Sequence, residues 1–325
     1  MSIFKNKENN YQAQEKFPID LVYTWVDSSD TRWLEKKSQF DESIKLINKD
    51  ATDKCRFQNN DELRYSLRSV EKYANWINKI YIVTDEQVPE WLNLDNEKVQ
   101  IIDHKEILPN DALPTYNACS IENGIANIEG LSEHFLYAND DMFFWNETEP
   151  EFFFDGNKPI IRIKERIKKY KEYKHLYGAM IYKAYITAKE AFKKDYPYFS
   201  HHNIDSYRKS LFTNCIAEFN DEFKKTAYNR FRTLEDMQRM IISFYSLAKD
   251  EAVLRDVNLS IFEKLLRKSP DSDYCNLKKK LLDKIINSES KLICINDCRK
   301  TTDEDREYLK EILNKKFPNK SQFEK

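Results

Sequence analysis

Glycine is scarce in this chain, with only 4 residues among 325. The phosphate loops of dinucleotide-binding proteins and of P-loop nucleotidases need several glycines at close spacing. Neither loop is present, so a diphosphate would have to be bound by a metal ion, by Arg or Lys, or by helix N-termini.

Long apolar runs are also missing, and cysteines are few. No apolar run is long enough to span a bilayer, and the polar residues 1–16 contain no apolar signal core. The closest pair of cysteines, Cys294 and Cys298, has no neighbouring His that would complete a zinc pattern. We therefore expect reduced thiols in a cytoplasmic protein, whose contact with the inner face of a membrane would be peripheral.

The chain lacks an excess of charge of either sign, because 53 Lys and Arg residues stand against 55 Asp and Glu residues. This balance gives no reason to expect a nucleic acid partner. Hydrophobic residues make up 41% of the chain, with 20 Phe and 19 Tyr. We expect a folded protein of one large domain or two ordinary ones.

The most informative stretch is FLYANDDMFF, residues 135–144. Its first residues predict a strand buried on both faces, which ends at Asp140 and Asp141. Two adjacent carboxylates there are costly unless a cation or good hydrogen bonds compensate, and such a pair can hold a divalent cation against a diphosphate. The alternative is a turn or a helix cap, a common use of paired Asp residues.

Three earlier segments, residues 19–27, 79–85 and 98–103, also predict strands, and helical patterns separate them. The alternation over 17–145 predicts an α/β fold with a mainly parallel sheet and helices on both faces. Ligands bind at the carboxyl edge of such sheets. Polar residues stand at these strand ends: Asp27, Asp85, and Asp103 followed by His104.

The first predicted strand delivers Trp25 and Asp27 to a loop, where they could contact a nucleotide. A buried Trp and an Asp that caps a helix starting near Thr31 would explain the two residues equally well.

Residues 59–74 predict an amphipathic helix. Asn59 and Glu62 have the spacing of a capping box. Asn60 and Arg64 would then lie around a helix N-terminus, which favours an anion.

The stretch IIRIKERIKKYKEYKHLY, residues 160–177, is basic and aromatic. It predicts a solvated segment or a surface that meets an anionic acceptor or membrane lipid. Further on, His201 and His202 precede a predicted helix, where they could act as bases or contact an anion; a surface loop is the alternative.

Thr233 and Asp236 have the spacing of a capping box before another helix, and Arg230 and Arg232 lie just before it, where they could bind phosphate. Residues 291–297, KLICIND, predict a late strand that returns to the same sheet. The expected units are a disordered lead-in (1–16), an α/β core (17–150), a helical and partly basic insertion (151–290), and a returning strand with a C-terminal helix (291–325).

Four blocks resemble the four conserved regions of the Stealth family, in the family's order. They are IDLVYTWVDSSDTRWL; RFQNNDELRYSLRSVEKYANWINKIYIVTD with its continuation to NDDMFF; HHNIDSYRKSL with NRFRTLEDMQ; and ICIND. The family includes bacterial capsular polysaccharide hexose-1-phosphate transferases and an animal N-acetylglucosamine-1-phosphotransferase. It often has a His-x-Pro element in the third block, where this chain has His201-His202-Asn203.

The resemblance implies a transferase that moves hexose- or N-acetylhexosamine-1-phosphate from a UDP-sugar to a hydroxyl of a saccharide acceptor. UMP leaves, and a phosphodiester of a capsular polysaccharide forms. The implied fold is Rossmann-like and similar to the glycosyltransferase-A enzymes, with 17–150 as the nucleotide-sugar-binding core. Mg²⁺ or Mn²⁺ is the implied cofactor, and a peripheral capsule-assembly complex is an implied partner.

The residue pattern and the resemblance together give expected roles. The expected metal ligands are Asp140 and Asp141, joined by Asn296 or Asp297. The expected base is His202, with Asp27 and His104 in reserve. The residues expected at phosphate oxygens are Arg232 and Arg64. Further contacts to the nucleotide or its phosphates are expected from Trp25, Asp27, Asn60, Asp85 and Arg230.

Two other functions remain open. A metal-dependent glycosyltransferase would form a glycosidic bond and release UDP instead of UMP. A sugar-nucleotide or glycan-binding module would bind its ligand without turnover.

Overall fold

The structure is a computed structural model that describes residues 17–40, 51–167, 176–256, 260–264, 284–298 and 301–325. The predicted lead-in at 1–16 and the end of the basic segment, 168–175, lie outside these residues. No helix in the described ranges has both the length and the apolar character that crossing a membrane requires.

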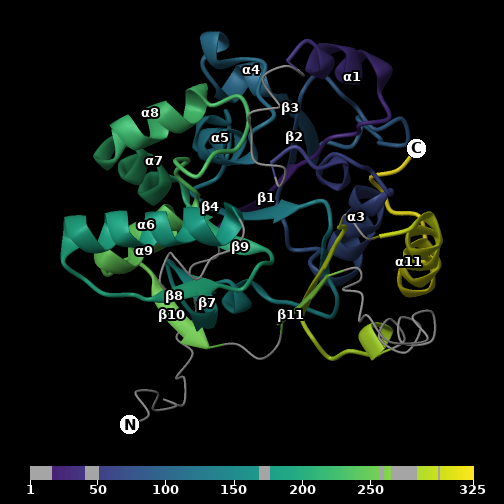
Figure 1. The fold of residues 1–325 in the computed structure, drawn as a ribbon. Coiled ribbons are helices and arrows are strands. Elements are labelled where there is room, and N and C mark those ends of the chain that lie inside the picture. The colour runs from purple at the N-terminus through teal and green to yellow at the C-terminus, as the bar shows by residue number, and fades with distance from the viewer. Residues whose placement is uncertain (1–16, 41–50, 168–175, 257–259, 265–283, 299–300) are drawn as a thin grey trace, which may run out of the picture.

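A five-stranded sheet in the order β3-β2-β1-β4-β9 forms the centre of the protein (Figure 1). β1 is parallel to both β2 and β4, β2 is parallel to β3, and β9 runs antiparallel to β4. The mainly parallel α/β sheet predicted from the sequence is thereby confirmed. The strands are β1 (Ile19–Thr24), β2 (Ile80–Thr84), β3 (Val99–Asp103), β4 (His134–Asn139) and β9 (Asp205–Arg208).

Both faces of the sheet are covered, which explains why its inner strands β1, β2 and β4 are mostly apolar and buried. In β1, Leu21 and Tyr23 pack into one apolar cluster, whereas Val22 packs into another on the opposite face. Alternate residues of a strand point to opposite faces, so each of these side chains needs an apolar neighbour. All three are fully buried.

Helices divide between the two faces. α3 contributes Leu63, Leu67 and Val70 to the cluster of Leu21, and the opposite cluster includes Ile181 of α6 and Ile241 of α9. The α-helices are α1 (Thr31–Ser38), α3 (Glu62–Tyr73), α4 (His104–Ile107), α5 (Ala118–Gly124), α6 (Leu176–Phe192), α7 (Lys209–Glu218), α8 (Asn220–Tyr228), α9 (Met240–Ala248) and α11 (Asp303–Lys316). The short 3-10 helices are η1 (Lys54–Arg56), η2 (Asn110–Ala112), η3 (Ile125–Asn127) and η4 (Pro150–Phe152).

The prediction that the late strand joins the central sheet is wrong. β12 (Leu292–Asn296) pairs antiparallel with β5 (Met142–Phe144) and parallel with β11 (Ser260–Lys264), which makes a separate sheet. β5 follows the Asp140-Asp141 turn directly and offers β12 a free edge. The late strand therefore reaches the acidic pair from outside the central sheet.

The insertion predicted as helical over 151–290 also contains strands. A second small sheet is built from β6 (Phe154–Asp155), β7 (Lys158–Arg166), β8 (Tyr198–Ser200) and β10 (Val253–Asp256). The described part of the basic segment is thus mostly a strand, and Ile160, Ile161 and Ile163 of β7 are buried.

Both predicted capping boxes are wrong. Asp61, with a φ of 70°, precedes α3, and the Glu62 carboxylate turns back to the amide of Asn60, leaving Asn59 outside the cap. Thr233 and Asp236 do bond to each other, but they close a turn, because α9 begins only at Met240.

Candidate functional site

The strand order places a topological switch point between β1 and β4. The chain passes from β1 to β2 and β3 on one side, and it returns as β4 on the other side of β1. Thr24, the last residue of β1, pairs with Asn139, the last residue of β4. In open α/β sheets the crevice beyond such strand ends is where ligands bind. Trp25 and Asp140 are the first residues beyond this pair.

Asp140 and Asp141 form the turn between β4 and β5, so the turn predicted as the alternative is present. Asp141 is buried; its Oδ2 accepts a hydrogen bond of 2.9 Å from Asn296 Nδ2, and its Oδ1 has no hydrogen-bond partner. Burial and the nearby Glu62 raise the pKa of Asp141 to about 7. Burial, Glu62 and Asp141 raise the pKa of Asp140 well above its ordinary value. The protein's own side chains therefore leave a negative charge on this turn largely uncompensated, and the charged form is disfavoured without a cation.

Glu62 enlarges this acidic cluster. It is buried at the start of α3, and its two carboxylate oxygens accept hydrogen bonds of 2.6 Å from the amide and the side chain of Asn60. Burial raises its pKa, and Asp297 adds to the rise. Asn60 Nδ2 lies 3.5 Å from Asp297, whose carboxylate is paired with Arg306 at 3.0 Å. The sequence did not identify Glu62 as a site residue, because it resembled a helix-capping residue.

The acidic cluster fits a divalent cation by its chemistry. Carboxylates buried with raised pKa values, one with an orphaned oxygen, are stabilised by a nearby positive charge. The described residues do not offer a ready-made cage of three or more His, Cys, Asp or Glu ligands. Mg²⁺ is usually held by one or two carboxylates together with substrate phosphates, which is the set that Asp140 and Asp141 could provide.

Asn296 and Asp297, the other two predicted metal ligands, already form hydrogen bonds with protein groups. The side-chain nitrogen of Asn296 faces Asp141, so this residue orients a carboxylate. Asp297 accepts from Arg306 and from the amide of Cys298.

A second cluster of polar residues, Glu122, Tyr137, Asn139 and Arg239, lies on the other side of the switch point from the acidic cluster. Glu122 of α5 is buried, and its Oε1 lies 3.2 Å from the hydroxyl of Tyr137, which is 2.7 Å from Asn139 Oδ1. Glu122 Oε2 is 3.4 Å from Arg239 Nε. Burial raises the pKa of Glu122, although Arg239 and Arg232 act against the rise. Glu122 was not predicted as a site residue, because a lone Glu within a helix is typical of a solvated face.

Arg232 and Tyr177 interact electrostatically with Glu122, and His202 contacts Tyr177. The Nε of Arg232 is buried without a hydrogen-bond partner, and its charge acts on Glu122. His202 Nδ1 is 3.0 Å from the hydroxyl of Tyr177, whose pKa is raised by burial and also responds to Glu122.

The loop after β1 holds Trp25 and Asp27. Trp25 is buried and its Nε1 has no hydrogen-bond partner. Asp27 accepts from Asn59 Nδ2 at 2.8 Å and from the amide of Ser29. The cap of α1 is Asp30 rather than Asp27, so the alternative explanation of Asp27 as a helix cap is wrong.

The ends of β2 and β3 lie farther from the acidic pair, since β3 is three strands, or roughly 14 Å, from β4. Asp85 forms an ion pair of 2.6 Å with Lys36. His104 is buried, and burial lowers its pKa to about 4. Asp103 caps α4 in a complete capping box.

Arg64 and Arg230 are engaged elsewhere. Arg64 pairs with Asp61 at 3.0 Å and with Glu324 at 3.2 Å. Arg230 donates to the carbonyl of Pro114 and lies 4.1 Å over the ring of Phe40. Either would have to give up protein contacts to bind a phosphate.

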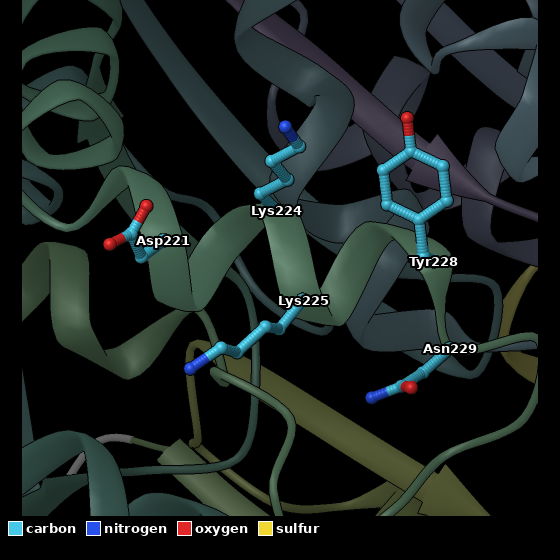
Figure 2. A pocket seen from close by; sticks show the side chains of 5 residues that line it. All are labelled: Asp221, Lys224, Lys225, Tyr228 and Asn229. Atoms are coloured by element: carbon cyan, nitrogen blue, oxygen red, sulfur yellow. The ribbon is translucent and has the colours of Figure 1, made fainter.

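A surface pocket lies along α8, lined by Asp221, Lys224, Lys225, Tyr228 and Asn229 (Figure 2). Lys224 and Tyr228 project to one side of α8, and Lys225 projects to the other. None of these residues carries a buried carboxylate or histidine, and only Asn229 contacts the interior, where it donates to Asp236. The acidic pair at the switch point is therefore the stronger candidate.

Comparison with known proteins gives matches along most of the chain. The profile described as "Stealth protein CR1, conserved region 1" matches residues 17–45, and "Stealth protein CR2, conserved region 2" matches residues 56–161. The "Exopolysaccharide phosphotransferase cps2G" of Lactiplantibacillus plantarum is 32% identical over 95% of this chain and 97% of its own length. The "Receptor polysaccharide phosphotransferase WefC" of Streptococcus gordonii is 30% identical over 94% and 98%.

Among solved structures, the galactosyltransferase LgtC in complex with donor and acceptor sugar analogues aligns over 91% of this chain and 96% of its own. The TM-score is 0.42 and the identity 10%. A likeness at this level adds nothing to the assignment of the site.

Proposed function

Because the chain belongs to the Stealth family, we propose that it is a polysaccharide phosphotransferase that takes its sugar 1-phosphate from a UDP-sugar. A hydroxyl of a saccharide acceptor attacks the phosphorus atom next to the sugar. The bond from that phosphorus to the bridging oxygen breaks, UMP leaves with that oxygen, and the sugar phosphate joins the acceptor as a phosphodiester. The product is a unit of an exopolysaccharide or capsular polysaccharide.

The observation that supports this proposal best is the acidic turn at the switch point. Asp140 and Asp141 are the residues that would hold Mg²⁺ or Mn²⁺, and Asn296 orients the Asp141 carboxylate toward that position. The cation would neutralise the diphosphate and the leaving UMP. Trp25, whose buried Nε1 lacks a partner, and Asp27 lie on the neighbouring loop and would contact the nucleotide.

The second buried cluster would serve the acceptor side. Phosphoryl transfer depends mainly on positioning and on stabilising charge, and the orphaned Nε of Arg232 is available for a non-bridging phosphate oxygen. His202 would accept the proton of the acceptor hydroxyl. His104 is a weaker candidate than His202, because it lies near the far edge of the sheet and is buried.

We place the reaction in the cytoplasm, at the inner face of the membrane where a polysaccharide under assembly would be presented. None of the five cysteines in the described ranges forms a disulfide, which fits a reducing compartment.

The proposal is tested by incubating the protein with a panel of UDP-sugars, a saccharide acceptor and Mg²⁺. The expected products are UMP, identified by chromatography, and a phosphodiester signal in the phosphorus NMR spectrum. Release of UDP with a new glycosidic bond would show an ordinary glycosyltransferase instead.

A further inference from the structure

Arg239 lies buried at the centre of a polar network that joins three elements. Its side chain is 3% exposed. One guanidinium nitrogen donates to Asp205 at 2.5 Å and to the hydroxyl of Tyr207 at 2.6 Å, both on β9. Its Nε faces Glu122 of α5, and the guanidinium lies 4.5 Å over the ring of Tyr137 on β4.

The network leads from Arg239 to the switch point. The hydroxyl of Tyr137 lies within hydrogen-bonding distance of Glu122, Asn139 and Thr24. Thr24 and Asn139 are the paired last residues of β1 and β4, and Asn139 directly precedes the acidic pair. Loss of Arg239 would leave the Glu122 carboxylate without its ion-pair partner. It would also remove the cation that packs against the ring of Tyr137.

We infer that Arg239 is a positioning residue for the transfer reaction: it fixes the Glu122 carboxylate and, through Tyr137, the Asn139 side chain beside the acidic pair. The inference rests on the function proposed above. Buried ion pairs rarely stabilise a fold better than apolar side chains of similar volume, so stability alone is a poor reason for a charge at this place.

The charge on Glu122 gives a readout that separates positioning from a merely structural role. The groups that act on or respond to this carboxyl are the cations Arg239 and Arg232, the carboxylate of Asp205, the thiol of Cys119, and the phenols of Tyr137, Tyr177 and Tyr207. Removing a cation raises the pKa of a neighbouring carboxyl. The acid limb of the pH–activity profile should therefore move to higher pH when Arg239 is lost.

The test compares Arg239→Met and Arg239→Lys with Arg208→Met as the matched control. Arg208 lies on β9, which Arg239 contacts, and pairs with two carboxylates, Glu133 and Glu251, away from the switch point. In Arg239→Met we expect kcat for UMP release to fall about 100-fold, with the KM for the UDP-sugar within threefold and the acid limb at higher pH. Arg239→Lys should recover part of kcat, and Arg208→Met should change neither quantity.

Circular dichroism and thermal unfolding establish that each variant is folded. Should Arg239→Met fail to fold, the double variant with Asp205→Asn removes the carboxylate left unpaired, and Arg239→Lys retains the charge. A folded Arg239→Met with kcat within threefold of the wild type would overturn the inference. So would a loss of kcat with an unmoved acid limb.

Failure of the proposed function is distinguished from failure of this inference, because in the first case the wild-type protein itself releases no UMP. In that case the titration of the Glu122 carboxyl, followed by carbon NMR in the wild type and in Arg239→Met, still tests whether Arg239 controls this group. An unchanged titration would contradict the inference.

Discussion

Two buried carboxyl groups, Asp141 and Glu122, account for most of the chemistry assigned to this protein. Each is held on one side by a protein donor, Asn296 for Asp141 and Tyr137 for Glu122. Each also has an oxygen that no hydrogen bond satisfies. Buried polar atoms are rarely left in this state in native proteins, so a ligand is the simplest explanation for Asp141, whereas the open oxygen of Glu122 lies 3.4 Å from Arg239.

Replacing Asp141 by Asn should abolish turnover without unfolding the protein. The raised pKa of Asp141 means that its charge is unfavourable in the folded state without a cation, so a neutral amide should leave the stability of the metal-free protein equal or higher. The kcat for UMP release should fall at least about 1,000-fold, since several kcal/mol of charge stabilisation are lost. Asp95→Asn, at an exposed loop position, is the control, and near-normal turnover of Asp141→Asn would remove the metal assignment.

The two adjacent histidines should respond differently to substitution by Gln. His202 is half-buried beside Tyr177, and loss of a general base typically costs 10²–10⁴-fold in rate, so kcat should fall by at least about 100-fold. His201 is buried, and its backbone amide bonds to the carbonyl of Arg162, so His201→Gln should mainly lower the melting temperature. Equal losses of kcat at normal stability would contradict the assignment of His202.

His104 should make stability depend on pH. Burial lowers its pKa from the ordinary 6.5 to about 4, so between these values the unfolded chain binds more protons than the folded one. Because of His104, the free energy of unfolding decreases by about 3 kcal/mol as the pH falls from 6.5 toward 4. Above pH 6.5 this loss of stability is absent. The fall in unfolding free energy between pH 7 and pH 4 should be smaller by that amount in His104→Gln, measured by urea denaturation. An identical fall in both proteins would show that His104 is not the group responsible.

At the scale of elements, the sequence was informative about the strands and poor about their partners. The apolar run before Asp140 predicted β4 and its acidic end, because a strand buried on both faces must be apolar throughout. The antiparallel pairing of β12 with β5 left no trace in the pattern of KLICIND, since pairing depends on which strand edge is free in three dimensions. Glu122 was missed because a lone Glu within a helix is typical of a solvated face and its cationic partner Arg239 is distant in the sequence.

The pairing of β12 with β5 should control the affinity for the cation. It places Asn296 beside Asp141, and loss of a partner that orients a metal ligand typically weakens binding 10–100-fold. Asn296→Ala should therefore need at least about tenfold more Mg²⁺ for half-maximal UMP release. Asn314→Ala on α11, which removes the acceptor of a hydrogen bond from Tyr65 of α3, should leave the Mg²⁺ requirement unchanged. An unaltered requirement in Asn296→Ala would contradict this role.

At the scale of the whole molecule, the protein gathers residues from distant segments at one edge of the central sheet. The acidic turn follows β4, Glu62 begins α3, Asn296 ends β12, and Arg239 precedes α9. Attack at phosphorus requires a neutralised diphosphate on one side and a positioned hydroxyl on the other. The two buried clusters on either side of the switch point match these two requirements.

The position of the broken bond tests this account most directly. A UDP-sugar that carries ¹⁸O between the anomeric carbon and phosphorus is incubated with Mg²⁺ and acceptor, and the products are analysed by mass spectrometry. Attack at phosphorus leaves the label in the phosphodiester product and releases unlabelled UMP, which is the result we predict. Labelled UDP beside an unlabelled glycoside would show attack at carbon and would contradict the account.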